Sequence, residues 1–197
     1  MNKPFSESSE QNKHVILSVI EKLYSEPGTV LEIGSGTGQH AVFFAEHLPH
    51  VYWQTTDLEE NLSGIQAWLD DSSLENLPAP LSLDVNQTDW PISHTDYIFS
   101  ANTVHIMSWD SVVSLFKLLG SVLKKQGLFV LYGPFNYHGA YTSESNANFD
   151  QWLKQRDPLS GIREFSELNK LARQFGMSLL EDIEMPVNNR ILVWQKQ

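Results

Sequence analysis

The 197-residue sequence contains no cysteine, which excludes disulfide bonds, thiolate nucleophiles and zinc sites built on cysteine. It also has no apolar run that approaches the ~18 residues of a membrane-spanning helix. Residues 1–14, MNKPFSESSEQNKH, are polar where a secretory signal peptide has an apolar stretch. The lack of a long apolar run and of a signal peptide predicts a soluble, cytoplasmic protein that does not enter a membrane.

Basic residues are scarce as well. The chain has 13 Lys and Arg against 24 Asp and Glu, and its formal net charge is −11. This charge repels a phosphate backbone, so nucleic acid is disfavoured as a partner. The 41% hydrophobic content suffices for one sizeable core, which predicts a single domain over residues 1–197. The sequence leaves the oligomeric state open.

Strand and helix patterns alternate through the first two thirds of the chain, and this alternation predicts a parallel sheet. The expected strands are TVLEI (29–33), VYWQTT (51–56), APLSLDV (79–85), TDYIFSAN (95–102) and LFVLYG (128–133). Helical patterns cover residues 15–23, 39–48, 60–71 and 112–122, and KKQG (124–127) is expected to stop the last of them.

The final third departs from this alternation. PFNYHGAYTSESN (134–146) is expected to be irregular, and two helical patterns follow at residues 149–153 and 165–175. MSLLEDIEMP and RILVWQKQ, joined by VNN, predict an antiparallel hairpin at the end of the chain. The predicted fold class is therefore α/β, a Rossmann-like doubly wound sheet that is mostly parallel with a C-terminal antiparallel hairpin.

Three glycines at alternate positions, Gly34, Gly36 and Gly38, follow the first expected strand. Glycine permits positive φ and lets a ligand approach the backbone, and in a doubly wound sheet this turn lies at the ligand crevice. A tight turn without a ligand is the alternative. The third glycine of the dinucleotide fingerprint is replaced by Gln39, so NAD is a second choice, and no lysine follows to support a Walker phosphate site.

Two acidic residues come at the ends of neighbouring strands. Asp57 ends the second strand, where an acid accepts hydrogen bonds from ribose hydroxyls, and a cap for the next helix is its alternative role. Asp84 comes at the end of the third strand, in a position suited to the exocyclic amine of a purine or to a role in a turn. Together with the glycines, these acids predict a nucleoside-containing ligand.

VLEIGSGTG, Asp57, LDV and FSANTVH resemble the motifs of class I S-adenosylmethionine-dependent methyltransferases, over almost the whole chain. HAVFFAEHLPHVYWQTTD, SNANFDQWLKQRDP and EMPVNN are similar to a family of uncharacterised methyltransferase-like proteins. The resemblance implies that the glycine turn accommodates the methionine portion of S-adenosylmethionine and that Glu32 orients its amino end. The implied cofactor-binding residues are Glu32, Gly34, Ser35, Gly36, Gly38, Asp57, Asp84, Val85 and Ala101.

Methyl transfer requires alignment of the nucleophile and exclusion of water, and it requires no metal. On the resemblance, His105 and Asn102 lie near the transferred methyl group. An imidazole with a pKa near ~6.5 accepts a proton from a hydroxyl at neutral pH, so His105 is the candidate base. A structural role for a partly buried His105 is the competing interpretation.

The acceptor is expected to contact residues that follow the last parallel strands: Tyr132, Phe135, Asn146, Arg156, Arg163, Asn188 and Asn189. Arg156 and Arg163 could clamp a carboxylate or phosphate, or could form surface ion pairs. Residues 135–163 are expected to act as a lid. The predicted function is methylation of a small polar molecule by S-adenosylmethionine. A non-catalytic cofactor-binding or interaction protein is the alternative, and an NAD-dependent enzyme comes third.

Overall fold

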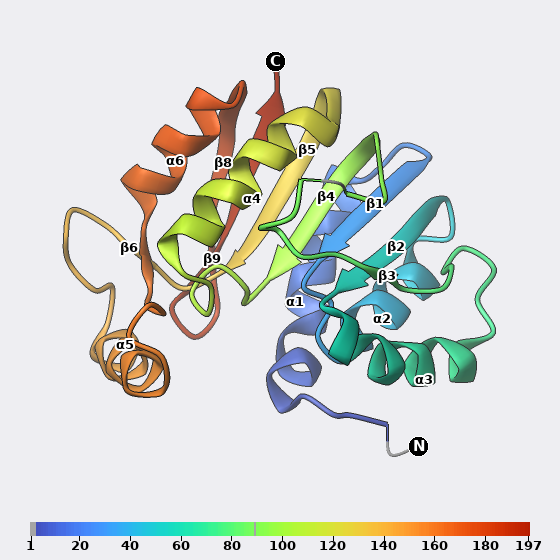
Figure 1. Cartoon of the computed structure of the whole chain (residues 1–197), viewed down its shortest axis with the longest axis horizontal. Helices are drawn as coiled ribbons and strands as arrows, with labels where there is room; N and C mark the ends of the chain where they lie inside the picture. Colours follow the sequence, from blue (N-terminus) through green and yellow to red (C-terminus); the bar gives the residue numbers. More distant parts are fainter. Residues whose placement is uncertain (1–2, 89) are drawn as a thin grey trace. The chain divides into compact units, whose positions relative to one another are not determined.

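The computed structural model describes residues 3–88 and 90–197 (Figure 1). Contacts between Cα atoms divide the chain into two compact units, Met1–Ser100 and Ala101–Gln197, which are described separately below. The single domain expected from the sequence stays a prediction. Within the described residues, every helix is too short or too polar to cross a membrane.

The strands of the first unit run parallel to one another. They are β1 (Gly28–Ile33), β2 (Val51–Asp57), β3 (Leu81–Ser82) and β4 (Thr95–Ala101). Their order is β3-β2-β1-β4, so the chain adds two strands on one side of β1 and then crosses to the other side. This reversal makes the carboxyl end of β1 the place where doubly wound sheets bind ligands. The third strand is shorter than the seven residues expected, because residues 83–85 leave it and enter a turn.

Aromatic side chains form the core of this unit. Phe44, Trp53 and Phe99 are fully buried, and their ring centroids lie 5.4 to 5.6 Å apart. Burial of each such side chain contributes about 1.5 to 3 kcal/mol. Because Trp53 comes from β2 and Phe99 from β4, the cluster fixes strands on both sides of β1 and hence the turn that follows it.

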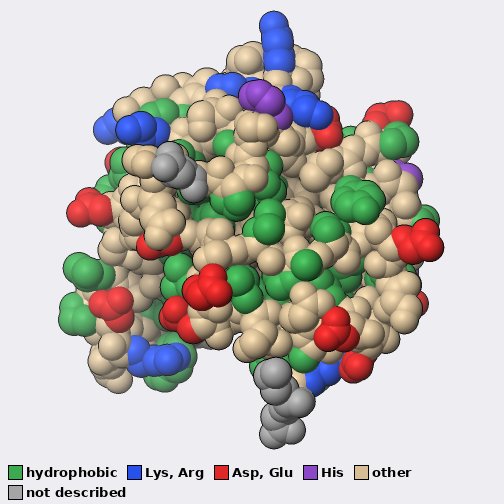
Figure 2. Space-filling view, turned by 45° about the vertical axis from the view of Figure 1, so that its right-hand side comes forward, with side chains coloured by type: hydrophobic (Ala, Val, Ile, Leu, Met, Phe, Trp, Pro, Cys, Tyr) green, Lys and Arg blue, Asp and Glu red, His purple; other side chains and the backbone are tan. Residues whose placement is uncertain are grey.

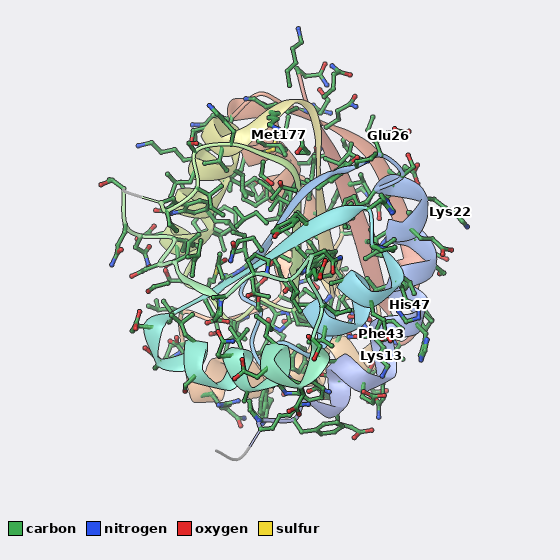
Figure 3. All side chains as sticks on the ribbon, turned by 90° about the vertical axis from the view of Figure 1, so that its right-hand side faces the viewer. Lys13, Lys22, Glu26, Phe43, His47 and Met177 are labelled. Atoms are coloured by element: carbon green, nitrogen blue, oxygen red, sulfur yellow. The ribbon has the colours of Figure 1, made fainter. Side chains whose placement is uncertain are left out.

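The helices of the first unit are α1 (Glu7–Leu23), α2 (Gln39–His47), the 3-10 turn η1 (Glu59–Asn61) and α3 (Leu62–Ser72). A buried hydrogen bond of 2.6 Å joins Asn12 of α1 to His40 Nε2 of α2. On the outer side of the same pair of helices, Lys13 Nζ lies 4.9 Å from the ring of Phe43, which contacts the imidazole of His47 (Figure 3). The start of α2, which carries the end of the glycine turn, is thus supported by α1.

The strands of the second unit include a large antiparallel sheet of order β5-β9-β8, formed by β5 (Leu123–Gly133), β8 (Met177–Met185) and β9 (Asn189–Lys196). The β8–β9 pair is the C-terminal hairpin predicted from the sequence. KKQG was expected to end a helix, but these residues lie inside β5, and Gln126 has a positive φ of 67°. Two short strands, β6 (Phe135–Asn136) and β7 (Arg163–Glu164), form a separate parallel pair.

The helices of the second unit are α4 (Trp109–Val122), α5 (Glu144–Arg156) and α6 (Phe165–Gln174). Helix α5 begins inside the segment expected to be irregular, because Ser143 caps it by accepting a hydrogen bond from Asn146 N. α4 and α6 approach so closely that a Cβ at Gly120 would lie 2.6 Å from Phe175 O. On the face drawn in Figure 2, acidic side chains are widely spread, in keeping with the net charge of −11.

Candidate functional site

The glycine turn after β1 has the backbone conformation that its sequence predicts. Gly34, Gly36 and Gly38 have φ values of 72°, 59° and 88°, which side-chain-bearing residues rarely adopt. The amides of Gly34 and Ser35 both donate to Thr56 O at 3.0 Å. These bonds fix the turn to the carboxyl end of β2, as a doubly wound sheet requires.

Gly36 and Gly38 differ in what surrounds them. A Cβ added at Gly36 would have no described atom within 4 Å, whereas one at Gly38 would lie 3.3 Å from Ile65 of α3. Gly38 is therefore required by packing against α3. Gly36 faces open space, so a ligand can approach its backbone closely.

Asp57, the last residue of β2, contacts this open part of the turn. Its Oδ2 accepts a hydrogen bond of 2.7 Å from Gly36 N. Its Oδ1 accepts from Leu58 N at 2.8 Å and from Asn61 Nδ2 at 2.7 Å. The carboxylate thus lies beside the glycines, where the sequence places it, and it also orders the start of η1.

Glu32 lies beneath the turn and is 2% exposed. Its Oε2 accepts hydrogen bonds from Ser35 Oγ at 2.8 Å and from Trp53 Nε1 at 3.1 Å. Burial raises the pKa of Glu32 to about 7, and the nearby charge of Asp57 adds to this effect. Glu32 therefore changes its charge within the physiological pH range.

Asp84 and Val85 follow β3 in a turn. Asp84 Oδ1 accepts from the backbone N of Asn86 at 2.9 Å and from its Nδ2 at 3.0 Å, which is the turn role weighed for this residue. Leu83 N donates to Asp57 O at 2.8 Å, so the residue before Asp84 contacts the end of β2. Val85 is buried. Their contact with an adenine ring stays a prediction.

In the second unit, Asn102 and His105 approach the same point. Asn102 directly follows Ala101, has a φ of 59°, and its backbone N donates to Tyr132 O at 2.9 Å. A Cβ added at Gly133 would lie 3.9 Å from Asn102 Oδ1 and 3.8 Å from His105 Nδ1. Two polar side-chain atoms thus lie close to the buried Gly133 at the end of β5.

The imidazole of His105 is 5% exposed, and its ring lies edge-on to Phe149 at 5.2 Å. Its Nδ1 is buried and has no hydrogen-bond partner among the described residues. Burial lowers the pKa of His105 to about 4, and the charge of Arg163 lowers it further. The imidazole is therefore neutral at pH 7, well away from the ordinary value used in the sequence argument.

The two arginines expected to clamp an anion have contacts within the chain. Arg163 donates through Nε to Val104 O at 3.0 Å and through Nη2 to Leu159 O at 3.0 Å and to Met107 O. The guanidinium of exposed Arg156 lies 4.7 Å from the ring of Trp152. Recognition of an anion by either arginine stays a prediction.

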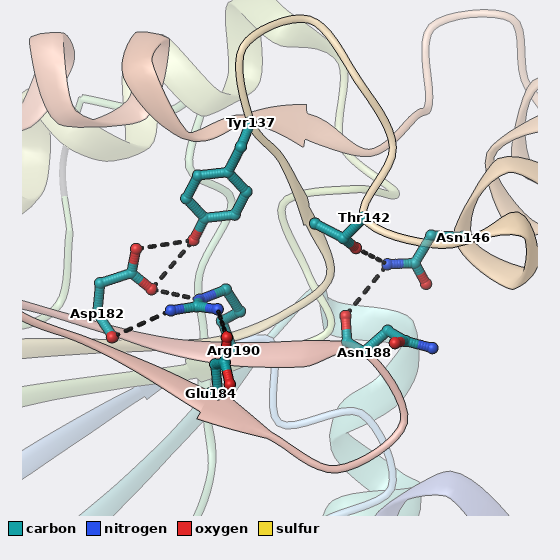
Figure 4. A network of polar contacts seen from close by, with 7 residues as sticks. All are labelled: Tyr137, Thr142, Asn146, Asp182, Glu184, Asn188 and Arg190. Atoms are coloured by element: carbon teal, nitrogen blue, oxygen red, sulfur yellow. Dashed lines mark hydrogen bonds and ion pairs between the residues drawn. The ribbon is translucent and has the colours of Figure 1, made fainter.

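The amide side chains expected to bind substrate connect two segments of the second unit (Figure 4). Asn146 Nδ2 donates to Thr142 Oγ1 at 2.9 Å and to Asn188 O at 3.1 Å, while Asn188 Nδ2 donates to Ser145 Oγ at 3.3 Å. Asn189 Nδ2 donates within the hairpin turn, to Pro186 O. The hairpin turn is therefore joined to the start of α5.

A second connection lies nearby, where Tyr137 OH donates to both carboxylate oxygens of Asp182 at 2.9 and 3.0 Å (Figure 4). Arg190 forms ion pairs with Asp182 and Glu184. Residues 135–163 are thus anchored to the hairpin at two places. Their movement as a lid stays a prediction.

Tyr132 and Phe135, also expected to contact the acceptor, are 3% and 0% exposed and belong to the core of the second unit. Sequence reasoning missed Asp150, a carboxylate that is 1% exposed in α5. Asn146, Asp150 and Leu153 form the buried face of that helix, so helical spacing was the available signal.

Comparison with known protein families assigns the chain to one of them. A family model described as "Protein of unknown function (DUF938)" matches residues 3–196. The chain belongs to this family. The uncharacterised family that the sequence resembles is thereby confirmed.

Solved structures similar to this DUF938 protein include two that are named as methyltransferases and the protein YcgJ. An O-methyltransferase family protein from Burkholderia thailandensis has a TM-score of 0.86 and 11% identity, with 96% of this chain and 56% of that chain covered. The apo form of the S-adenosylmethionine-dependent methyltransferase SibL has a TM-score of 0.80 and 18% identity, with 96% and 55% covered. YcgJ from Bacillus subtilis has a TM-score of 0.75 and 16% identity, with 93% and 99% covered.

The DUF938 chain therefore spans about half of the length of the first two proteins and nearly all of YcgJ. At these identities the likeness establishes the fold, which is the Rossmann-like methyltransferase fold predicted from the sequence.

Proposed function

We propose that this protein transfers a methyl group from S-adenosylmethionine to a small polar molecule. The observation that carries the proposal is the arrangement of Gly36 and Asp57, in which a carboxylate accepts a hydrogen bond from a glycine whose Cβ position is open. A nucleoside cofactor needs both a close approach to the backbone and an acid for its ribose hydroxyls.

The remaining residues of the first unit fit the same cofactor. Glu32 can ionise near neutral pH and hold an ammonium group, since its pKa is about 7. Gly34 and Ser35 keep the turn attached to β2 through Thr56 O. When bound, S-adenosylmethionine supplies a methyl group that is activated by its bond to the sulfonium sulfur, so the protein mainly aligns the acceptor and excludes water.

We assign the acceptor side to the second unit. Neutral His105 offers a lone pair at Nδ1 when its proton is on Nε2, and the amide of Asn102 also lies close to Gly133. An acceptor hydroxyl near Gly133 would donate its proton to His105 while Asn102 fixes its orientation. The neutral state of His105 at pH 7 supports this role, because a protonated imidazole could accept nothing.

The test uses the full chain. Calorimetry with S-adenosylmethionine and with S-adenosylhomocysteine measures cofactor binding, and both should bind. Incubation with methyl-labelled S-adenosylmethionine and a fractionated metabolite extract should then transfer label to a small molecule identified by mass spectrometry. Absence of binding to both compounds would overturn the proposal. Binding without transfer from any fraction would favour the non-catalytic alternative, and preferential binding of NAD would favour a dehydrogenase.

A further inference from the structure

The backbone around His105, residues 104–107, is held by one short segment, Ser160–Arg163, which we call the carbonyl clamp. Each of the four consecutive carbonyl oxygens of residues 104–107 accepts a hydrogen bond from it. The bonds are Arg163 Nε to Val104 O at 3.0 Å, Gly161 N to His105 O at 2.8 Å, Ser160 Oγ to Ile106 O at 3.1 Å, and Arg163 Nη2 to Met107 O. Such a complete set is more than ordinary loop packing requires.

The clamp is itself fixed by Asp150 of α5. Asp150 Oδ1 accepts a hydrogen bond of 2.7 Å from Ile162 N, and its Oδ2 accepts from Tyr141 OH at 2.7 Å and from Lys154 Nζ at 2.6 Å. Gly161 passes so close that a Cβ there would lie 2.9 Å from Asp150 Oδ1. A buried carboxylate with this many donors has one stable position, and it defines where the clamp begins.

The His105 side chain has no comparable restraint of its own. Its Nδ1 has no described partner, and its buried ring lies between Phe149 and the backbone of Gly133. The position from which Nδ1 points therefore depends on the backbone of residues 104–107, which carries the ring, and on its packing against Phe149. Whatever holds that backbone determines whether Nδ1 meets the same point as Asn102 Oδ1.

We propose that Arg163 and Asp150 are positioning residues that act through the carbonyl clamp to direct His105 Nδ1 toward Gly133. The proposal rests on the role assigned to His105 in the proposed function. It replaces anion binding as the main task of Arg163, because that side chain is occupied by three backbone carbonyls. The clamp does not contact the acceptor in this scheme.

Charge adds a second effect of Arg163 on His105. Among the charged groups on the elements packed around the imidazole, Asp150 and Lys154 form an ion pair with each other, which leaves Arg163 as the group that disfavours a positive imidazole. Removal of the Arg163 charge should raise the pKa of His105 from about 4 toward its ordinary value. A purely structural arginine at a distance would leave this pKa unchanged.

The test compares five variants of the full chain by NMR and by turnover. Arg163→Gln removes the guanidinium group and its charge, and Arg163→Lys removes the guanidinium group but keeps the charge. Asp150→Ala removes the acceptor for Ile162 N, and Asp150→Asn keeps one. Arg173→Gln, at the exposed end of α6, is the charge-matched control. NMR follows the His105 imidazole titration and the hydrogen exchange of the Gly161 amide, with no ligand present.

In Arg163→Gln we expect the pKa of His105 to rise and exchange at Gly161 to accelerate by about 10-fold or more. Arg163→Lys should retain the low pKa of His105 but lose the protection of the Gly161 amide against hydrogen exchange. Asp150→Ala should also lose this protection, and Asp150→Asn should restore it. Methyl transfer should fall by about 10- to 100-fold in kcat, with KM for S-adenosylmethionine unchanged.

Unchanged titration and exchange in folded Arg163→Gln and Asp150→Ala would overturn the clamp. So would altered NMR behaviour with wild-type kcat, because positioning would then have no catalytic effect. If the wild-type protein transfers no methyl group at all, the proposed function fails, while the titration and exchange data still decide whether Arg163 and Asp150 position His105.

Discussion

The backbone amide of Gly36 donates a hydrogen bond of 2.7 Å to Asp57 Oδ2, which joins the turn after β1 to the last residue of β2. We expect Asp57→Ala to weaken binding of S-adenosylhomocysteine by about 10- to 100-fold, since buried ribose hydroxyls lose a charged partner. Calorimetry measures the change. Glu60→Ala, at an exposed position on η1, is the control for loss of local negative charge. Equal affinities for Asp57→Ala and wild type, with both folded, would remove Asp57 from the site.

The two glycines with different surroundings give a second prediction. Gly36→Ala should cost about 1 kcal/mol of stability from positive φ alone, because its Cβ meets nothing within 4 Å. Gly38→Ala should cost more, because its Cβ also lies 3.3 Å from Ile65. Urea unfolding gives both values. Cofactor affinity should nevertheless fall sharply in Gly36→Ala, and retention of full affinity there would support a turn that needs no ligand.

Glu32 makes stability depend on pH. Its folded pKa is about 7, above the usual value of 4.5, so the folded state binds this proton more tightly than the unfolded chain. The resulting stability is present below pH 4.5 and is lost as the pH rises through 7. Glu32→Gln should therefore be more stable than wild type at pH 8, by about 1 to 3 kcal/mol, and this gain should shrink toward pH 5. Thermal unfolding between pH 5 and 8 tests this, with exposed Glu46→Gln as a control that should follow the wild type.

His105 predicts the pH dependence of turnover. Since its pKa is lowered to about 4, kcat at saturating S-adenosylmethionine should stay level from pH 8 down to about 5 and fall only near pH 4. His105→Ala should reduce kcat by about 10²- to 10⁴-fold and leave cofactor affinity unchanged. His94→Ala, in an exposed loop, should behave as wild type. Wild-type turnover by folded His105→Ala would leave alignment by Asn102 as the simpler mechanism.

Much of the fold could be predicted because its signals are local. Apolar periodicity marked β1, α2, β2 and the β8–β9 hairpin, and the turns within this set contain glycine, proline or asparagine. The start of β5 could not be predicted in this way. Lys124, Lys125 and Gln126 are exposed in that strand. The start of β5 is therefore defined by strand pairing and not by burial, and hydrophobic periodicity reports only burial.

The cofactor residues have a local sequence signal, whereas the contacts around His105 have none. Gly36 and Asp57 were found because each lies at or shortly after the end of a strand, and strand ends can be located from sequence. The contacts of Arg163 could not be found, since its partners Val104 O and Met107 O are backbone atoms 59 and 56 residues away. Any residue type offers a carbonyl oxygen, so no sequence pattern marks it as a partner.

Asp150 has a consequence for the order in which the protein folds. Its three partners, Lys154, Tyr141 and Ile162, lie only 4, 9 and 12 residues away in the chain. The bond between Asp57 and Gly36 spans 21 residues, and the bond between Tyr137 and Asp182 spans 45. Contacts over short stretches of chain close fastest, because little chain entropy is lost. We therefore expect residues 141–162 to become ordered early during refolding, and the glycine turn to become ordered only when β1 and β2 have paired.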